Sequence, residues 1–504
     1  MFESRLLNSG ACSAALAALV LLAGCAVGPA YVRPAPLPVT GYTARVGPAQ
    51  SRPHRHVPTQ HFQYGRSPRV RWWRHFHSRV IDALVNQALR NNPGLHAAEA
   101  TLREAHYALR ADQGIFFPQV SLGLSGERSR SSGAGSGGVF QPPIFNLYTG
   151  QVSVSYYPDI FGLNHLLTDQ GRAEEAVARD ELHAARLTLE GNVLNTLFDW
   201  IALRREVASQ VRTIDDQRTL LSLVRKRYHL GADSELDVLT QQTELASSDA
   251  ALPPLESARD QAAHLLAVYL GEFPAQARHL GQLGFRAIYL PRHLPVTLPS
   301  TLVRLRPDIL AAESQLRAAN AVVGQRVAAL YPLIELTAGG GVESNSWHTL
   351  FDPASRIWDL GAALAMPLFD GGTLEAEKQE AVESYRALFA DYQSVVLNAF
   401  ANVADALRAL EHDSSTLAAE THALHAARRA FRLVKVEYRS GAVNYLSVLA
   451  SETELETARV GYVQAQARRY TDTVALYVAL GGNRLPTASH RPSHTLRAPE
   501  EVRP

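Results

Sequence analysis

The sequence is poor in cysteine, with only Cys12 and Cys25 in a chain of 504 residues. Two cysteines exclude both a disulfide framework and a zinc site built from cysteine ligands. The chain also lacks a charge excess, because 49 Lys and Arg residues balance 48 Asp and Glu residues. A nucleic-acid-binding protein normally shows a clear basic surplus, so we predict no nucleic-acid partner. A hydrophobic fraction of 46% excludes disorder over the whole chain.

The common catalytic motifs are missing as well. There is no H-E-x-x-H, no phosphate-binding P-loop and no G-x-S-x-G. Residues 133–138 fit G-x-G-x-x-G, but they lie in a Ser/Gly loop that runs into Pro142 and Pro143. Without a helix N-terminus to present backbone amides, such glycines do not form a phosphate site. We predict neither enzymatic activity nor a cofactor.

Histidines gather in two places. His422 and His425 share a helical face near Glu420, which is more typical of a solvated helix surface than of a metal site. A looser group in the N-terminal segment comprises His54, His56, His61, His75 and His77. The second group either binds a metal weakly or has no specific role. We predict no dedicated metal site.

The N-terminus is typical of an export signal. Arg5 supplies a positive charge, and the apolar run over residues 14–23 is too short to span a bilayer. The run ends in Leu-Ala-Gly-Cys25, which resembles the bacterial lipobox, whose cysteine is acylated before cleavage. The resemblance implies a signal peptide over residues 1–24 and a lipid-anchored Cys25. Ala26 is compatible with sorting to the outer membrane. No later segment has about 18 consecutive apolar residues.

Most of the remaining chain is a duplication. Tyr228-His-Leu-Gly231-Ala matches Tyr438-Arg-Ser-Gly441-Ala, and Leu270-Gly matches Leu480-Gly, both 210 residues apart. Upstream, the segment that begins at Pro93 matches the one at Pro307, 214 residues apart. Three collinear blocks make a chance similarity between alanine-rich helices improbable.

Each copy contains two stretches with strand-like alternation. Leu122 and Val154 alternate with small polar residues such as Ser121 and Ser153, and the second copy behaves in the same way. The pattern fits a membrane barrel, apolar toward lipid and polar toward a lumen, and it also fits a half-buried soluble sheet. Prolines that flank the strands and a cluster of aromatic residues at the same level favour the barrel. These residues are Pro118, Pro158, Pro332, Pro367, Phe116, Phe117, Tyr156, Tyr157 and Tyr331.

Four strands are too few to close a barrel, since the smallest single-chain examples use about eight. Open sheet edges in lipid would leave backbone groups unpaired, so several chains would have to share one barrel.

Helices make up the rest of each copy. A first helix is predicted from Val80 to about Ile115, and its counterpart from Ile309 to about Leu330. Two much longer helical patterns start near residues 162 and 372 and continue without proline to Gly231 and Gly441. A glycine there is typical of a left-handed helix cap, with Asp233 or Ser234, and Asn444, as N-caps of the returning helices. Each copy therefore ends in a long antiparallel helical hairpin.

Taken in order, these features resemble the outer membrane factors (TolC-like) of tripartite efflux and secretion systems, closest to their lipoprotein NodT-like branch. The resemblance is carried by residues 25–31, Trp72-Trp73, Asn92-Pro93, 298–300, 306–309 and the two Tyr-x-x-Gly turns. It implies a mainly α-helical chain whose trimer forms a 12-stranded outer membrane β-barrel and a periplasmic α-barrel. The implied partners are a periplasmic adaptor, an inner-membrane pump, most simply of the RND type, and outer membrane lipid.

By the same resemblance, the Tyr-x-x-Gly turns form the periplasmic tip, where the channel closes and the adaptor docks. The residues predicted to act there are Tyr228, Gly231, Asp237, Tyr438, Arg439 and Gly441. We expect Asp237 to contact Arg439 or Tyr438. Some relatives carry an aspartate ring at the positions of Ser447 and Ala450, so an acidic constriction and its ion selectivity are in doubt here.

The predicted domains follow from this order. They are the signal peptide (1–24), a lipid-anchored extended segment (25–78), a first repeat (79–271), a connector (272–306), a second repeat (307–483) and a disordered tail (484–504). Strands are expected at about 118–126, 148–157, 332–342 and 357–366, and tip turns at about 228–234 and 438–444. The predicted function is an efflux exit channel for small molecules such as drugs. The alternatives are a type I protein secretion channel and, in another class, a lipid-anchored periplasmic coiled-coil scaffold.

Overall fold

A computed structural model describes residues 27–35, 39, 41–43, 49–54, 57–130, 144–276 and 283–482. The chain divides into two compact units. We call them the strand unit (Met1–Pro36, Ala97–Leu182, Asp308–Val396) and the hairpin unit (Leu37–His96, His183–Pro307, Leu397–Pro504). Each unit takes residues from both copies of the duplication, because equivalent elements of the two copies pack side by side.

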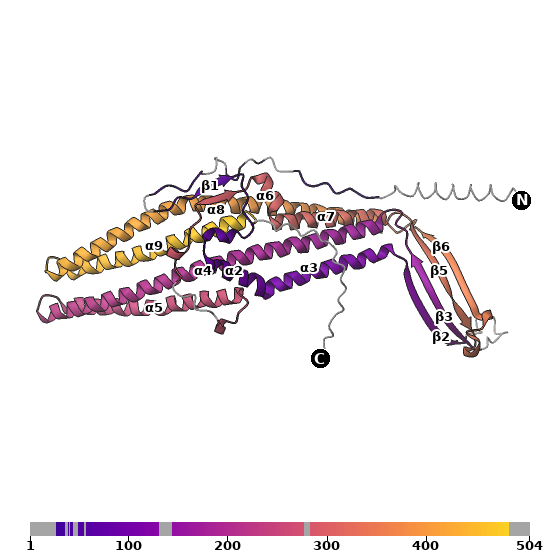
Figure 1. Cartoon of the computed structure of the whole chain (residues 1–504), viewed down its shortest axis with the longest axis horizontal. Coiled ribbons are helices and arrows are strands. Elements are labelled where there is room, and N and C mark those ends of the chain that lie inside the picture. Colours follow the sequence, from indigo (N-terminus) through magenta and orange to yellow (C-terminus); the bar gives the residue numbers. More distant parts are fainter. Residues whose placement is uncertain are drawn as a thin grey trace. The chain divides into compact units, whose positions relative to one another are not determined.

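The strand unit contains a four-stranded antiparallel sheet (Figure 1). Its strands are β2 (Gln119–Ser129), β3 (Phe145–Tyr156), β5 (Leu333–Ser344) and β6 (Arg356–Ala365), in the order β2-β3-β5-β6. Val120 pairs with Val154 and Ile334 with Leu364, so the apolar positions of neighbouring strands share one face. The alternation seen in the sequence therefore produces one apolar face and one face of small and polar residues.

The prolines and aromatic residues that flank the strands meet at one end of the sheet. A cavity of about 550 Å³ at this end is lined by Tyr157, Pro158, Tyr331, Pro332 and Pro367, among others. Tyr331 also stacks on Phe161, with ring centroids 5.1 Å apart. The grouping of these residues at one level of the sheet is confirmed.

One of the predicted helices is wrong in its continuity. In place of a single helix from Val80 to Ile115, the structure has α2 (Arg79–Asn91), α3 (Pro93–Asp112) and a short 3₁₀ turn, η2 (Gln113–Phe116). The break falls at Asn92, whose backbone is extended (φ −68°, ψ 120°). Proline clashes with a preceding residue in the α conformation, so Pro93 forces Asn92 out of the helix and begins a new one. The counterpart in the second copy is α7 (Pro307–Ala328).

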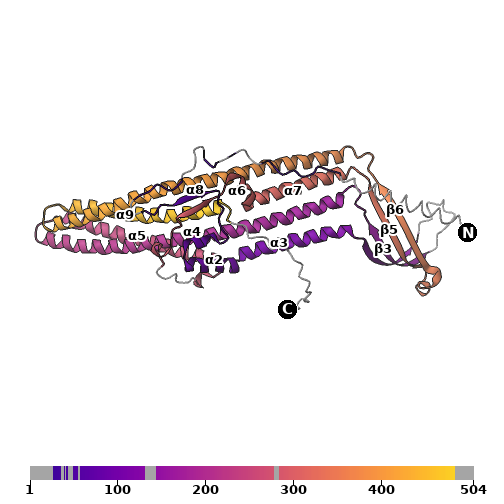
Figure 2. The same ribbon diagram turned by 45° about the horizontal axis from the view of Figure 1, so that its top comes forward.

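The long helices belong to both units. They are α4 (Leu163–His229) and α8 (Thr373–Arg439), each of 67 residues. Within the hairpin unit they are followed by α5 (Glu235–Tyr269) and α9 (Tyr445–Ala479), each of 35 residues (Figure 2). The equal lengths of the paired helices are the structural trace of the duplication. No helix in the described part of the chain is both long and apolar enough to cross a membrane.

The N-terminal segment (25–78) is more than the extended segment that was predicted. Strand β1 (His61–Tyr64) pairs in parallel with β4 (His293–Val296) of the connector. A 3₁₀ helix, η1 (Trp72–Phe76), follows, and Trp72 stacks on Tyr477 at 5.1 Å. The aromatic side chains explain the difference, because burying one such side chain stabilises the fold by about 1.5–3 kcal/mol. The connector also contains the short helix α6 (Pro299–Leu305).

Candidate functional site at the hairpin turns

The two hairpin turns share one backbone motif. Gly231 and Gly441 adopt φ of 75° and 81°, the left-handed conformation that was predicted for them. In each turn, the amide of the following alanine donates to a carbonyl five residues upstream, at 2.8 Å (Ala232) and 2.9 Å (Ala442). This is the hydrogen-bond pattern of a Schellman cap. A short link then leads into the returning helix.

The N-caps of the returning helices are Ser234 and Asn444. Ser234 forms a capping box with Asp237: the Ser234 hydroxyl accepts from the Asp237 amide at 3.2 Å, and the Asp237 carboxylate accepts from the Ser234 amide at 2.9 Å. The Asn444 side chain accepts from the amide of Ser447 at 3.2 Å and from its hydroxyl at 2.9 Å. Asp237 and Ser447 therefore stabilise helix starts.

A charged cluster joins the two turns. The Tyr438 hydroxyl donates to the carboxylate of Asp233 in the other hairpin. The Arg227 guanidinium donates to the same carboxylate at 3.0 Å and to the Tyr438 carbonyl at 2.8 Å, and it lies 4.5 Å from the centre of the Tyr438 ring. We call Arg227, Asp233 and Tyr438 the tip cluster.

The tip cluster is shielded from water. Tyr438 is 0% exposed, and the side chains of Asp233 and Arg227 are 6% and 18% exposed. Burial raises the pKa of Tyr438, and the adjacent Asp233 carboxylate raises it further. The phenol therefore stays protonated and acts as a donor. A hydrogen bond to a charged partner contributes about 1.5–3 kcal/mol, more than an exposed ion pair would.

The contact predicted for Asp237 is wrong. Its carboxylate is bound to Ser234, and Asp233 is the carboxylate that meets Tyr438. Arg439 is exposed, and Tyr228, the counterpart of Tyr438, is 39% exposed. Arg227 was not predicted, and Asp233 was considered only as a helix cap. Its place before the N-cap, where its side chain is free to turn toward the other hairpin, is the signal that could have identified it.

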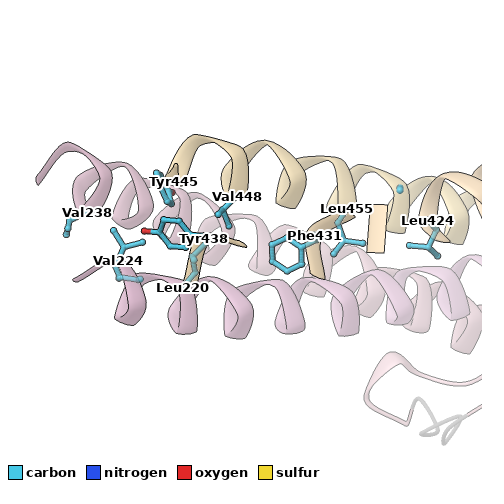
Figure 3. Close-up of a cluster of buried hydrophobic side chains, with 11 residues drawn as sticks. Leu220, Val224, Val238, Leu424, Phe431, Tyr438, Tyr445, Val448 and Leu455 are labelled. Carbon is cyan, nitrogen blue, oxygen red and sulfur yellow. The ribbon is translucent and has the colours of Figure 1, made fainter. Parts of the chain in front are cut away.

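Figure 3 shows a core of buried side chains that shares Tyr438 with the tip cluster. All four helices contribute to this core, which includes Leu220, Val224, Val238, Leu424, Phe431, Tyr438, Tyr445, Val448 and Leu455. Tyr445 also donates to Gln241 at 2.8 Å. Together the core and the tip cluster hold the two hairpins against each other.

A buried carboxyl group, that of Glu452, lies on α9 between the core residues Val448 and Leu455. Glu452 is 4% exposed, and burial raises its pKa to about 8, with nearby Glu456 and Asp216 adding to the shift. Burial also raises the pKa of Glu456. Lys435 and Arg459 lie 3.7 and 3.8 Å from Asp216. Since water-exposed glutamates ionise near pH 4.3, Glu452 is a carboxyl group that the packed hairpins keep protonated at neutral pH.

Histidines of the N-terminal group have separate partners. His61 stacks on His293 at 5.6 Å, His75 stacks on Tyr477 at 5.9 Å, and His54 lies 3.2 Å from the Ser415 hydroxyl. Over the residues that the structure describes, no three His, Cys, Asp or Glu side chains gather as metal ligands. Cys25, His56, the glycine-rich loop at 133–138 and the predicted tail lie outside the described residues.

Known proteins are similar to this chain over most of its length. The family described as outer membrane efflux protein matches residues 84–272 and 298–482. The outer membrane protein OprJ of Pseudomonas aeruginosa is 30% identical over 478 residues, which cover 93% of this chain and 95% of OprJ. The pyoverdine export outer membrane protein OpmQ of the same organism is 30% identical over 415 residues, covering 82% and 87%.

Solved structures give the same result. The outer-membrane channel OprN superimposes with a TM-score of 0.80 at 26% identity, covering 91% of this chain and 99% of OprN.

Proposed function

The chain belongs to the outer membrane efflux protein family, and on this basis we propose that it is the passive exit duct for small molecules in a tripartite pump. The protein is an outer membrane efflux channel, located in the cell outer membrane. Members of this family are trimeric channels that serve as outer membrane components of tripartite systems. Family members are channel proteins, and we extend this to the absence of catalytic activity here.

The observation that carries the proposal is the match of both repeats to the family, together with a sheet that cannot close alone. Family membership rules out the scaffold alternative, since a scaffold would need no channel. Export of small molecules is favoured over type I protein secretion by OpmQ, whose name assigns it to the export of pyoverdine. The specific partners we propose are a periplasmic adaptor and an inner-membrane pump of the RND type.

A lipid anchor at Cys25 completes the proposal. The residues just after it are held on the strand unit: the Val27 amide donates to the Phe161 carbonyl at 3.2 Å, and Asn320 donates to the Pro29 carbonyl at 2.8 Å. Arg33 donates to the buried carboxylate of Glu313 at 2.5 Å. An anchor next to a firmly attached segment would hold the protein to the membrane without a free tether.

We propose further that the hairpin turns are the gate and the adaptor contact, with Tyr228, Gly231, Tyr438, Arg439 and Gly441 at the tip. The tip cluster supports this role because its polar contacts join one hairpin to the other. Opening would replace these contacts with hydrogen bonds to water. Asp237 then acts by fixing the start of α5.

The test of the exit-duct function uses a strain that lacks its own outer membrane efflux channel. The chain is expressed with the adaptor and pump encoded beside its gene, and drug accumulation and secreted proteins are both measured. Lowered drug accumulation that requires all three components supports the proposal. Export of a protein substrate without any change in drug accumulation would favour type I secretion.

The gate is tested with Gly441→Val. A β-branched residue at φ 81° is strained by about 1–3 kcal/mol, and no neighbouring atom lies within 4 Å to add a clash. We expect export to fall while trimers still form. Ala442→Val, one residue further on, adds the same side chain at an exposed position and should leave export unchanged. Normal export by Gly441→Val would place the gate elsewhere.

A further inference from the structure

Within the part of the chain that the structure describes, no further strand pairs with either edge of the four-stranded sheet. Strands β2 and β6 are its outer strands, and nearly all of their residues are exposed on both faces. The inner strands β3 and β5 are partly covered along most of their length. An edge in lipid leaves backbone amides and carbonyls unpaired at several kcal/mol each. The occupant of these edges must therefore supply a strand.

We propose that β6 of one copy pairs antiparallel with β2 of a second copy of this chain, with Ala363 opposite Ser125 and Leu364 opposite Leu124. We call this pairing the seam. The inference rests on the proposed trimeric channel and adds the residue-by-residue register, meaning which residues face each other across the strands. It is derived from the duplication.

The duplication assigns each strand its counterpart. Helices α4 and α8 begin at residues 163 and 373, so the second half of each copy is offset by 210. Helices α3 and α7 begin at Pro93 and Pro307, so the first half is offset by 214. Accordingly β2 corresponds to β5 with an offset of 214, and β3 corresponds to β6 with an offset of 210.

The registers of the two β-hairpins agree with the sum of these offsets, 214 + 210 = 424. Val120 pairs with Val154 in the first hairpin, and shifting these residues by 214 and 210 gives Ile334 and Leu364. Ile334 and Leu364 are indeed paired in the second hairpin. The same transformation therefore reproduces an observed register.

Within one chain, the β-hairpin of the first repeat contacts the β-hairpin of the second repeat where β3 pairs with β5. Val154 faces Ala338 and Ser153 faces Gly339. In a closed ring of repeats, the next such contact is between β6 and the β2 of a second copy. Adding 210 to the residue numbers of β3 gives the equivalent residues of β6, and subtracting 214 from those of β5 gives the equivalent residues of β2. Leu364 then lies opposite Leu124, and Ala363 opposite Ser125.

The facing of the side chains supports this register. Even-numbered residues form the apolar face in all four strands, and directly opposed residues point to the same side. The seam likewise pairs even-numbered residues of β6 with even-numbered residues of β2. Aligning β3 and β6 on their flanking prolines, Pro158 and Pro367, would give an offset of 209 and place Leu364 opposite Gly123. That slip of one residue would put an apolar side chain beside one from the polar face.

The polar face adds a second argument. Within the chain, the Thr149 hydroxyl donates to the Glu343 carboxylate at 3.4 Å across the β3–β5 contact. The equivalent residues at the seam are Asp359 and Ser129 of the second copy. A hydroxyl and a carboxylate again face each other, with their strands exchanged, so the seam preserves the donor–acceptor pair.

The test is disulfide formation between four introduced cysteines. Two pairs lie opposite each other at the seam, Ala363→Cys with Ser125→Cys, and Ala365→Cys with Gly123→Cys. Opposed residues in an antiparallel pair have Cα atoms about 4.5–5.5 Å apart, within the range of a disulfide. Exchanging the partners, 363 with 123 and 365 with 125, gives two matched controls that use the same cysteines but are displaced by two residues.

All four positions are on the polar face, so a water-soluble oxidant reaches them. A disulfide within one chain is excluded, because three strand spacings of about 4.8 Å separate β2 from β6. Trimers in outer membranes are treated with copper phenanthroline and analysed on denaturing, non-reducing gels. Single-cysteine variants control for Cys12 and Cys25.

We expect both opposed pairs to convert to covalent trimers and both displaced pairs to remain largely uncrosslinked. Faster crosslinking of a displaced pair would overturn the register. If the parent chain forms trimers on native gels and exports drug, but no pair crosslinks, the seam is overturned while the channel function stands. A parent chain that forms no trimers would overturn the proposed function and the seam with it.

Discussion

The buried carboxyl group of Glu452 makes the packing of the two hairpins dependent on pH. Its Oε2 atom has no hydrogen-bond partner among the described residues. Charged groups face it from all four helices: Asp216 of α4, Glu244 of α5, Lys435 of α8 and Glu456 of α9. When the hairpins separate, water reaches this carboxyl group and its pKa returns to the ordinary value of about 4.3. Opening of the proposed gate would therefore allow Glu452 to ionise.

The magnitude follows from the two pKa values. In the packed hairpins the pKa of Glu452 is about 8, so the carboxyl group keeps its proton up to that pH. In separated hairpins it loses the proton above about pH 4.5. The packed state thus binds more protons between pH 4.5 and 8, and its stability falls as the pH rises through this window. At about 1.4 kcal/mol for each pH unit, packing loses about 3 kcal/mol between pH 4.5 and 7.

The assay is single-channel recording of trimers in planar bilayers between pH 5 and 8. We expect the open probability of the parent protein to rise with pH, and that of Glu452→Gln to stay low and flat, because glutamine keeps the neutral form. Glu454→Gln, an exposed neighbour on the same helix, should retain the pH dependence of the parent. Parallel pH curves for the parent and Glu452→Gln would refute the assignment.

Three further predictions concern the membrane anchor, the strands and the tip. Cys25→Ser should abolish labelling with radioactive palmitate and impair maturation, and label retained in this variant would contradict the lipobox. Leu122→Arg, on the lipid face, should impair assembly by about 2–4 kcal/mol if it lies near the bilayer midplane, whereas Ser121→Arg should be tolerated; equal defects on trimer gels would argue against a lipid-facing barrel. Tyr438→Phe removes the hydroxyl bond to Asp233 and should raise single-channel conductance, whereas Tyr228→Phe, which is partly exposed, should leave it near that of the parent.

The repeat structure and the strands could be predicted because their signals are local. Alternation in segments such as residues 120–124 follows from the two-residue period of a strand, whatever lies beside it. The left-handed glycines 231 and 441 were predictable for the same reason, since the end of a helical pattern at a glycine is a local signal. The break at Asn92 was also local, but the helical periodicity on both sides of Pro93 concealed it.

The N-terminal segment and the tip cluster could not be predicted because they depend on distant partners. Trp72 stacks on Tyr477, about 400 residues away in the sequence, and its indole N–H donates to the Glu190 carboxylate at 2.7 Å. Prolines in this segment indicated an extended backbone correctly, but extension does not distinguish a free tether from one that is packed. Only the tertiary arrangement supplies that distinction.

The two tip tyrosines show where a repeat ceases to be informative. Tyr228 and Tyr438 occupy equivalent positions before equivalent glycines, yet one is 39% exposed and the other fully buried. The difference arises from the opposite hairpin: Tyr438 meets the carboxylate of Asp233, and the residue equivalent to Asp233 in the second copy is Val443. A valine can accept no hydrogen bond, so the reciprocal contact cannot form. The duplication thus preserved the backbone of the turn, while divergence at one position made the polar contact between the hairpins one-sided.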